Sequence, residues 1–232
     1  MKIQIESLSI PAGKENGDYI LQRELPNGAT LILLADGMGG LSLPESASKV
    51  VCEAISEYFV KTDIIDCTEH ILRSIKYADE RLAAFCKEKK FKMGAALLLV
   101  YISDAMLFYT SLGDVRLYYR DKQGEVTQLT NDDTIMQGAD TYLTTCIAGR
   151  GFRNPIQVQR LPLNMGDSLL LCSDGYYKVH DIPHCFHHKE QTPPTLIDDD
   201  SSVVRIETVS YTHLTLPTTP NVQISGVAGR LK

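Results

Sequence analysis

Alternating apolar and polar residues open the chain and predict strands. Residues 2–10 alternate in this way, and the stretches 19–25 and 30–35 follow with the turn Pro26-Asn27-Gly28 between them. Turn residues of this kind between two strand patterns predict an antiparallel hairpin. The stretch 30–35 is apolar throughout, so we predict that it lies buried at the centre of a sheet.

Two longer segments carry apolar residues at helical spacing. The first helix is predicted for 44–59, and the second runs from Thr68, a candidate N-cap, to about Lys89. Short strand patterns separated by hairpin-type turns come next and predict a β-meander over 94–102, 105–111, 115–120 and 126–129. Residues 131–141 are predicted to form a loop with room for one helical turn.

The rest of the chain returns to strand patterns. Residues 156–161 and 168–172 are predicted to pair as strands, and 203–207 as a final strand. The stretch 176–196 is rich in His and Pro and is predicted to be irregular. Strands, then two long helices, then further antiparallel strands predict an α+β fold in which helices pack on sheets.

Composition and charge narrow the function. A chain of 232 residues is long enough for one sizeable core, and a net charge of −6 makes it a poor partner for nucleic acid or anionic membranes. We find neither an apolar signal segment nor the roughly 18 apolar residues that cross a bilayer, so we expect a cytoplasmic location. Six cysteines without a CxxC pair predict reduced thiols.

The end of the chain differs in character. From about Val209 the sequence is rich in Thr and Pro and resembles the translation of a sequencing-library adapter. We therefore predict a domain of residues 1–208 and a non-native or disordered tail of residues 209–232, in which case the natural C-terminal segment is missing. The alternative is a natural disordered tail.

Aspartates stand at the ends of several apolar stretches, most of them next to glycine. They occur in Asn16-Gly17-Asp18, Asp36-Gly37, Gly113-Asp114, Asp174-Gly175 and Asp198-Asp199-Asp200. A strand end holds a carboxylate on a rigid element, and glycine lets the backbone come close to a ligand. Any single Asp-Gly is a common turn dipeptide. The whole set instead predicts a site for divalent cations, which prefer oxygen ligands and can activate water and clamp a phosphoryl group.

From about Gly13 to Glu207 the sequence resembles the PP2C-type (PPM) protein phosphatases, especially their compact bacterial members, because its motifs occur in the order found in that family. The matching segments are Ala35-Asp36-Gly37-Met38-Gly39-Gly40, Met93-Gly94-Ala95-Ala96, Leu112-Gly113-Asp114-Val115-Arg116, Leu129-Thr130-Asn131-Asp132, Cys172-Ser173-Asp174-Gly175 and Asp199-Asp200-Ser201-Ser202. The resemblance implies an αββα sandwich of two antiparallel sheets flanked by helices. It also implies hydrolysis of phosphoserine and phosphothreonine in proteins by a hydroxide that two Mn²⁺ or Mg²⁺ ions activate, opposed by a Ser/Thr kinase.

The resemblance also implies roles for single residues. Asp36 would bridge the two metals, the Gly37 carbonyl would bind the second, and Asp174 and Asp199 would bind the first. Asp114 would be the ligand of a third, weakly held ion. Asp18 would act near the metals through water, and the role of the motif residue Asp132 stays open.

Two positions depart from the family pattern. Gly13 stands where relatives commonly carry a phosphate-binding Arg, and the neighbouring Lys14 supplies positive charge without the bidentate fork of arginine. Gly17 stands where relatives often have Glu or Gln. These departures leave open a catalytically weak PP2C-like module that binds phosphoproteins and regulates, and a small-molecule phosphatase is a third candidate. Asp36, Asp174 and Asp199 favour the enzyme.

A second possible metal site lies in a histidine-rich stretch. It contains His180, His184, Cys185, His187 and His188. Pro183 interrupts the helical pairing of His180 with His184, so solvated loop histidines are preferred to a zinc site.

Overall fold

Two antiparallel five-stranded sheets form the centre of the protein. The computed structural model describes residues 1–38, 43–63, 66–138, 140–187 and 198–209. One sheet has the order β1 (Lys2–Ile10), β12 (Ser201–Val209), β11 (Ser168–Cys172), β6 (Arg116–Arg120) and β7 (Val126–Gln128). The other has the order β10 (Gln159–Pro162), β5 (Met106–Leu112), β4 (Ala95–Ser103), β3 (Thr30–Gly37) and β2 (Asp18–Glu24).

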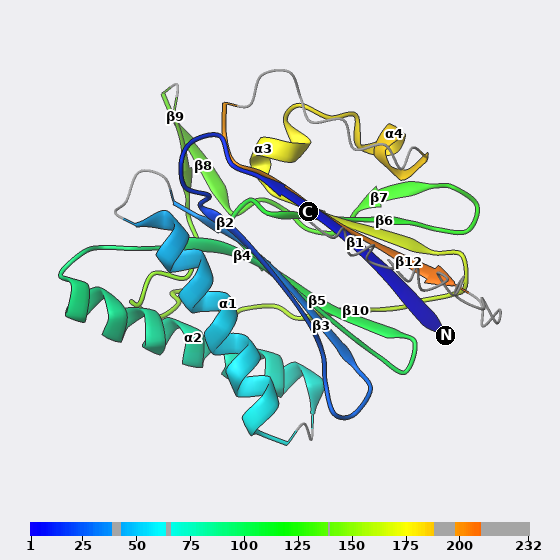
Figure 1. Ribbon diagram of the computed structural model, residues 1–232, viewed down its shortest axis with the longest axis horizontal. Coiled ribbons are helices and arrows are strands. Elements are labelled where there is room, and N and C mark those ends of the chain that lie inside the picture. Colours follow the sequence, from blue (N-terminus) through cyan, green and yellow to red (C-terminus); the bar gives the residue numbers. More distant parts are fainter. Residues whose placement is uncertain (39–42, 64–65, 139, 188–197, 210–232) are drawn as a thin grey trace, which may run out of the picture.

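Helices cover the outer face of each sheet (Figure 1). The long helices α1 (Pro44–Lys61) and α2 (Cys67–Lys89) pack on the β2–β5 sheet. The short helices α3 (Asp174–Tyr177) and α4 (Ile182–His187) lie over the other sheet, where Tyr176, Ile182 and Phe186 pack on its strands. The predicted αββα sandwich is therefore confirmed, and its second helical layer is made of these short helices.

The continuous apolar stretch of β3 has a direct structural reason. Its alternate residues Leu31, Leu33 and Ala35 pack toward the helices, whereas Ile32 and Leu34 pack toward the other sheet. Since side chains of a strand alternate between faces, a strand buried on both faces must be apolar at every position. The strand is buried as predicted, although β4 and not β3 takes the central place in the sheet.

Two predicted strand pairings are wrong. The strands β4 and β5 pair, but the chain then crosses to the other sheet, where β6 pairs with β7 and β11, so there is no continuous meander. The strands β10 and β11 also lie in different sheets, β10 on β5 and β11 between β6 and β12. Short strands with turns between them do not reveal a change of sheet, because the local pattern is the same in both cases.

Three local predictions also need correction. The stretch 176–196, predicted to be irregular, contains α4. Residues 131–141, predicted as a loop, contain β8 (Thr134–Gln137), which pairs with β9 (Asp140–Leu143). The N-cap of α2 is Asp66 and not Thr68, because an Asp66 carboxylate oxygen accepts a hydrogen bond from the Glu69 N–H at 2.7 Å.

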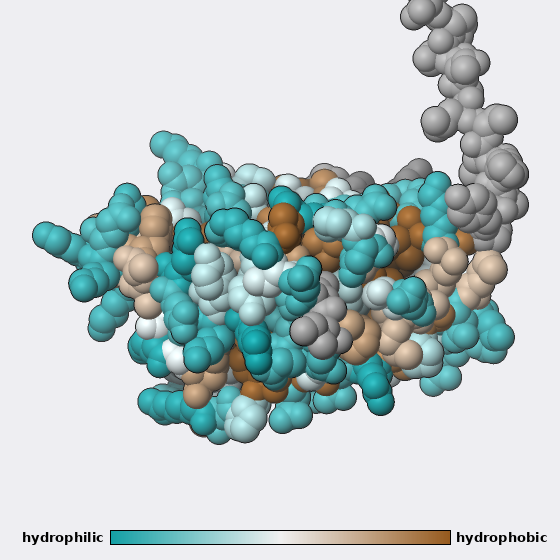
Figure 2. All heavy atoms as spheres, turned by 90° about the horizontal axis from the view of Figure 1, so that it is seen from below, coloured by the Kyte–Doolittle hydropathy of each residue, from teal (hydrophilic) through white to brown (hydrophobic). Residues whose placement is uncertain are grey.

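The final strand β12 includes Val209, and the predicted tail beyond it lies outside the described residues. All six cysteines are free thiols. No helix in the described ranges has the length and apolar character needed to cross a membrane. The face that carries the long helices is largely hydrophilic, with smaller hydrophobic patches (Figure 2).

Candidate metal centre

One end of the sandwich gathers the aspartates because neighbouring strands begin and end there. Asp18 opens β2 and lies directly opposite Asp36 near the end of β3. Asp174 follows the end of β11, and Asp199 precedes the start of β12, the antiparallel neighbour of β11. Asp114 lies where the chain crosses from β5 to β6. Strand ends from both sheets therefore bring together carboxylates that are far apart in sequence.

Four of these carboxylates line one cavity, which we call the acid pocket. It has a volume of about 260 Å³, and its walls include Asp36, Gly37, Asp114, Asp174 and Asp199. Tyr142 and Leu143 of β9 also line it, so the small β8–β9 hairpin forms one wall. The predicted bridging residue, the predicted backbone ligand and the three further predicted metal ligands thus share one cavity.

Asp18 is buried and does not belong to the lining of this pocket. Its Oδ2 atom accepts a hydrogen bond from the Ser173 hydroxyl at 2.7 Å, while its Oδ1 atom has no hydrogen-bond partner. Burial raises the pKa of Asp18 from its usual 3.8 to about 7, and the charges of Asp200 and Asp174 add to the rise, which the hydroxyls of Ser202 and Ser173 partly oppose. A buried carboxylate oxygen without a partner is costly unless a cation or water approaches it.

Asp36, Asp114 and Asp199 of the acid pocket are also harder to ionise than usual. Burial raises the pKa of Asp36 well above its usual value, and neighbouring carboxylates, Asp18 foremost, raise it further. Burial and the charge of Asp174 raise the pKa of Asp114 to about 6 and also raise that of Asp199. Divalent cations would relieve this repulsion, and an all-oxygen donor set suits Mn²⁺ or Mg²⁺.

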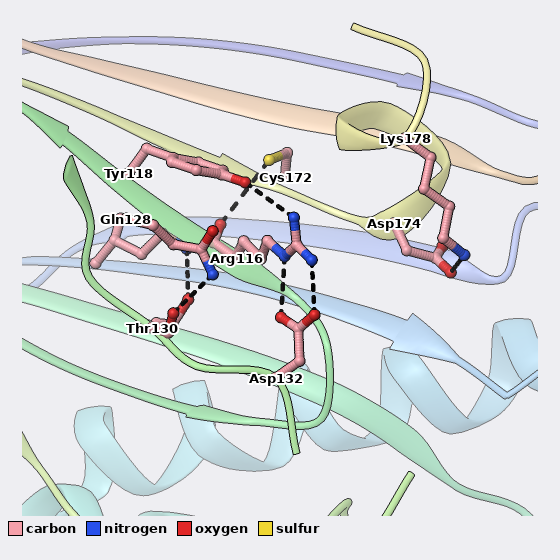
Figure 3. A network of polar contacts seen from close by, with 9 residues as sticks. Arg116, Tyr118, Gln128, Thr130, Asp132, Cys172, Asp174 and Lys178 are labelled. Atoms are coloured by element: carbon pink, nitrogen blue, oxygen red, sulfur yellow. Dashed lines mark hydrogen bonds and ion pairs between the residues drawn. The ribbon is translucent and has the colours of Figure 1, made fainter. Parts of the chain in front are cut away.

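The carboxylates do not by themselves form a closed ligand shell. Within the described residues, no three His, Cys, Asp or Glu side chains already converge as ligands of one ion would. Instead, the Lys178 ammonium forms an ion pair with Asp174 (Figure 3), and its nitrogen lies 2.6 Å from Oδ2. Cation binding would therefore draw on further oxygen atoms, such as the Gly37 carbonyl and water.

The role of Asp132 is structural. Its two carboxylate oxygens accept hydrogen bonds from Nε and Nη2 of Arg116 at 2.9 and 2.7 Å, and the same guanidinium donates to the Tyr118 hydroxyl (Figure 3). The guanidinium also stacks on Tyr177, 3.7 Å from the ring centre. This bidentate pair fixes the start of β6 beside the acid pocket.

Asp200 has a structural role that the sequence did not predict. Its carboxylate accepts hydrogen bonds from the backbone N–H groups of Ala12 and Gly17 at 2.7 and 2.6 Å, and so holds the loop that leads into β2. A Cβ on Gly17 would lie 3.1 Å from this carboxylate and 3.3 Å from the Gly37 carbonyl oxygen. The packing thus gives a steric reason for glycine at this departure from the family pattern.

Several predicted residues lie elsewhere. Lys14 is exposed in the loop before β2 and does not belong to the lining of the acid pocket, so its phosphate contact stays a prediction. Gly39, Gly40 and His188 lie outside the described residues. His180 stacks on the Tyr176 ring and its Nδ1 atom lies 2.9 Å from the Tyr176 carbonyl oxygen, which accounts for this histidine without a metal.

Comparisons of the sequence relate the chain to known proteins. A family model described as protein phosphatase 2C matches residues 9–202. A putative protein phosphatase 2C-type of Streptococcus pyogenes is 27% identical over 140 residues, which cover 59% of this chain and 56% of that protein. The serine/threonine protein phosphatase PstP of Mycobacterium tuberculosis is 28% identical over 166 residues, covering 64% of this chain and 32% of PstP.

Solved structures share the fold. The catalytic domain of PstP in complex with two manganese ions superposes with a TM-score of 0.72 at 22% identity, over 90% of this chain and 99% of that one. At this identity the likeness establishes the architecture alone. The chain spans about half or less of the length of the two relatives above.

Proposed function

The chain belongs to the protein phosphatase 2C family, and we propose that it hydrolyses phosphoserine and phosphothreonine in proteins with the help of two divalent cations. The observation that supports this proposal most strongly is the acid pocket, in which Asp36, Asp114, Asp174 and Asp199 face one cavity. The substrates would be phosphorylated proteins, with a Ser/Thr kinase as the opposing enzyme. The cytoplasmic location stays a prediction.

We assign the residues different roles according to their positions. Asp36, Asp174 and Asp199, with the Gly37 carbonyl, would hold the two ions, and Asp114 would serve a third. Bound Mn²⁺ or Mg²⁺ supplies activation of water and neutralisation of phosphoryl charge. Asp18 lies opposite Asp36 and would act near the ions through water.

Other residues keep this arrangement rigid. The Ser173 hydroxyl donates a hydrogen bond to Asp18 and accepts one from the Ser202 N–H at 3.0 Å, which links the end of β11 and the start of β12 to the start of β2. The backbone amide of Gly37 donates to the Gly17 carbonyl at 3.0 Å. Such positioning allows a site to act without reorganisation during the reaction.

The test is phosphate release from a phosphothreonine peptide in Mn²⁺, in EDTA, and by the Asp36→Asn variant. We expect turnover that depends on the cation and is lost in both EDTA and the variant, while the exposed control Asp63→Asn keeps its activity. No turnover by a folded protein in millimolar Mn²⁺ or Mg²⁺ would favour the binding module. Faster turnover of metabolite phosphates than of peptides would favour the small-molecule phosphatase.

A further inference from the structure

A second cavity lies beside the acid pocket and has no role in the chemistry described so far. Residues of the segment 143–154 enclose it, and its volume is about 570 Å³, within the roughly 300–1,000 Å³ typical of ligand pockets. Its lining includes Arg150, Arg153 and Asn154. We call this cavity the arginine groove.

The segment around the arginine groove is fixed by buried contacts. The Asp79 carboxylate of α2 is buried and accepts hydrogen bonds from the backbone N–H groups of Ala148, Gly149 and Gly151 at 3.2, 2.7 and 2.7 Å. Gly149 has φ +68° and packs so closely on Ala83 that a Cβ would lie 2.7 Å from the Ala83 Cα. The groove is therefore held in shape before any ligand binds.

The charges of the groove are free to meet a ligand. Phe152 packs partly buried against the core, and Arg150 and Arg153 on either side of it are exposed. Among the described residues, neither arginine forms an ion pair within 4.0 Å of an acidic side chain. The nearby Asp79 already accepts three backbone hydrogen bonds. The groove therefore presents two positive charges on a protein whose net charge is −6.

The arginine groove adjoins the acid pocket. Leu143 lines both cavities. Ile147 is joined to Ala95 by two backbone hydrogen bonds of 2.9 and 3.0 Å, and Ala95 is the partner of Gly37 in the sheet. A peptide whose phosphoryl group enters the acid pocket would reach the groove across Leu143, the residue that lines both cavities.

We propose that the arginine groove binds a second anionic group of the substrate, so that Arg150 and Arg153 select phosphopeptides with acidic flanking residues. This proposal rests on the phosphatase function proposed above. The ligand chemistry is a carboxylate or a further phosphate, since planar guanidinium groups bind both through paired hydrogen bonds. A metal-bound acid pocket would no longer repel such a segment, and the arginines would fix its direction.

The experiment compares phosphothreonine peptides in Mn²⁺. One series places Glu at each neighbouring position in turn, a second places Gln there, and a third carries a second phosphothreonine. We expect the best anionic peptide to exceed its Gln counterpart about tenfold in kcat/KM, mainly through KM. The variant Arg150→Gln/Arg153→Gln should bring this ratio close to one. The Glu and phosphothreonine series distinguish the two anion sources.

The matched control is Arg23→Gln/Arg160→Gln, which removes the same charge from exposed sites elsewhere and should keep the wild-type ratio. An equal ratio in the groove variant and the wild type would overturn the proposal, as would a wild type without preference. Fluorescence anisotropy of labelled Glu and Gln peptides that carry a non-hydrolysable phosphonate, measured on the wild-type protein in Mn²⁺, gives the same comparison without turnover. If the wild type hydrolyses neither peptides nor a small aryl phosphate, the phosphatase function fails, and the anisotropy ratio still decides the groove.

Discussion

Replacement of Asp18 by Asn is expected to make the metal-free protein more stable at alkaline pH. The pKa of Asp18 is raised from 3.8 to about 7 in the fold, so the folded protein binds a proton more tightly than the unfolded chain. Such a group contributes stability that is present at low pH and is lost as the pH rises from about 4 to 7. The Asn variant cannot lose a proton there and escapes this loss.

The magnitude follows from the size of the shift. A shift of about three pKa units corresponds to about 4 kcal/mol at full ionisation, of which about 2.5 kcal/mol falls between pH 5 and pH 8. The free energy of unfolding of Asp18→Asn, relative to the wild type, should therefore rise by about 2.5 kcal/mol over this interval. A change in the Ser173 hydrogen bond in the variant alters its free energy of unfolding by the same amount at pH 5 and at pH 8, so it leaves this difference unchanged.

The assay is urea unfolding in EDTA at pH 5 and pH 8, followed by circular dichroism because the chain contains no tryptophan. Asp63→Asn, an exposed substitution, should show no pH-dependent difference. Addition of Mn²⁺ should reduce the advantage of Asp18→Asn at pH 8, because bound cations neutralise the same repulsion. A difference between variant and wild type that stays constant from pH 5 to pH 8 would refute the reasoning.

Three further substitutions probe the surroundings of the acid pocket. Lys178→Ala removes the ammonium group that is paired with Asp174. Calorimetry should then show Mn²⁺ binding that is about two- to fivefold tighter, which corresponds to the free energy of an ion pair at the protein surface. The control Lys61→Ala breaks a similar i,i+4 ion pair and should leave Mn²⁺ binding unchanged. Arg116→Lys loses the bidentate contact and should cost about 1–3 kcal/mol in urea unfolding; equal stability would contradict this. Gly37→Ala would place a Cβ on the Pro44 backbone, so we expect lower thermal stability and weaker Mn²⁺ binding, and unchanged values of both would count against the close packing.

Local sequence patterns predicted much of the architecture. The apolar β3 stretch, the hairpin around Pro26-Asn27-Gly28 and the two long helices were all predictable, because burial and turn chemistry act over a few residues. The αββα arrangement came from the resemblance. The sheet to which each short strand belongs was not predictable, as β6 and β10 demonstrate, because either sheet satisfies the same local alternation.

The candidate site was likewise predictable from the sequence only in part. The sequence by itself determined which aspartates stand at strand ends, and the motif order indicated that Asp36, Asp174 and Asp199 belong together. Only the tertiary structure decided that Asp200 holds the backbone loop that leads into β2. It also placed Arg150 and Arg153 beside the acid pocket. Hydrogen bonds and ion pairs depend on distances between strand ends and loops that are remote in sequence, and only the packing of the two sheets sets those distances.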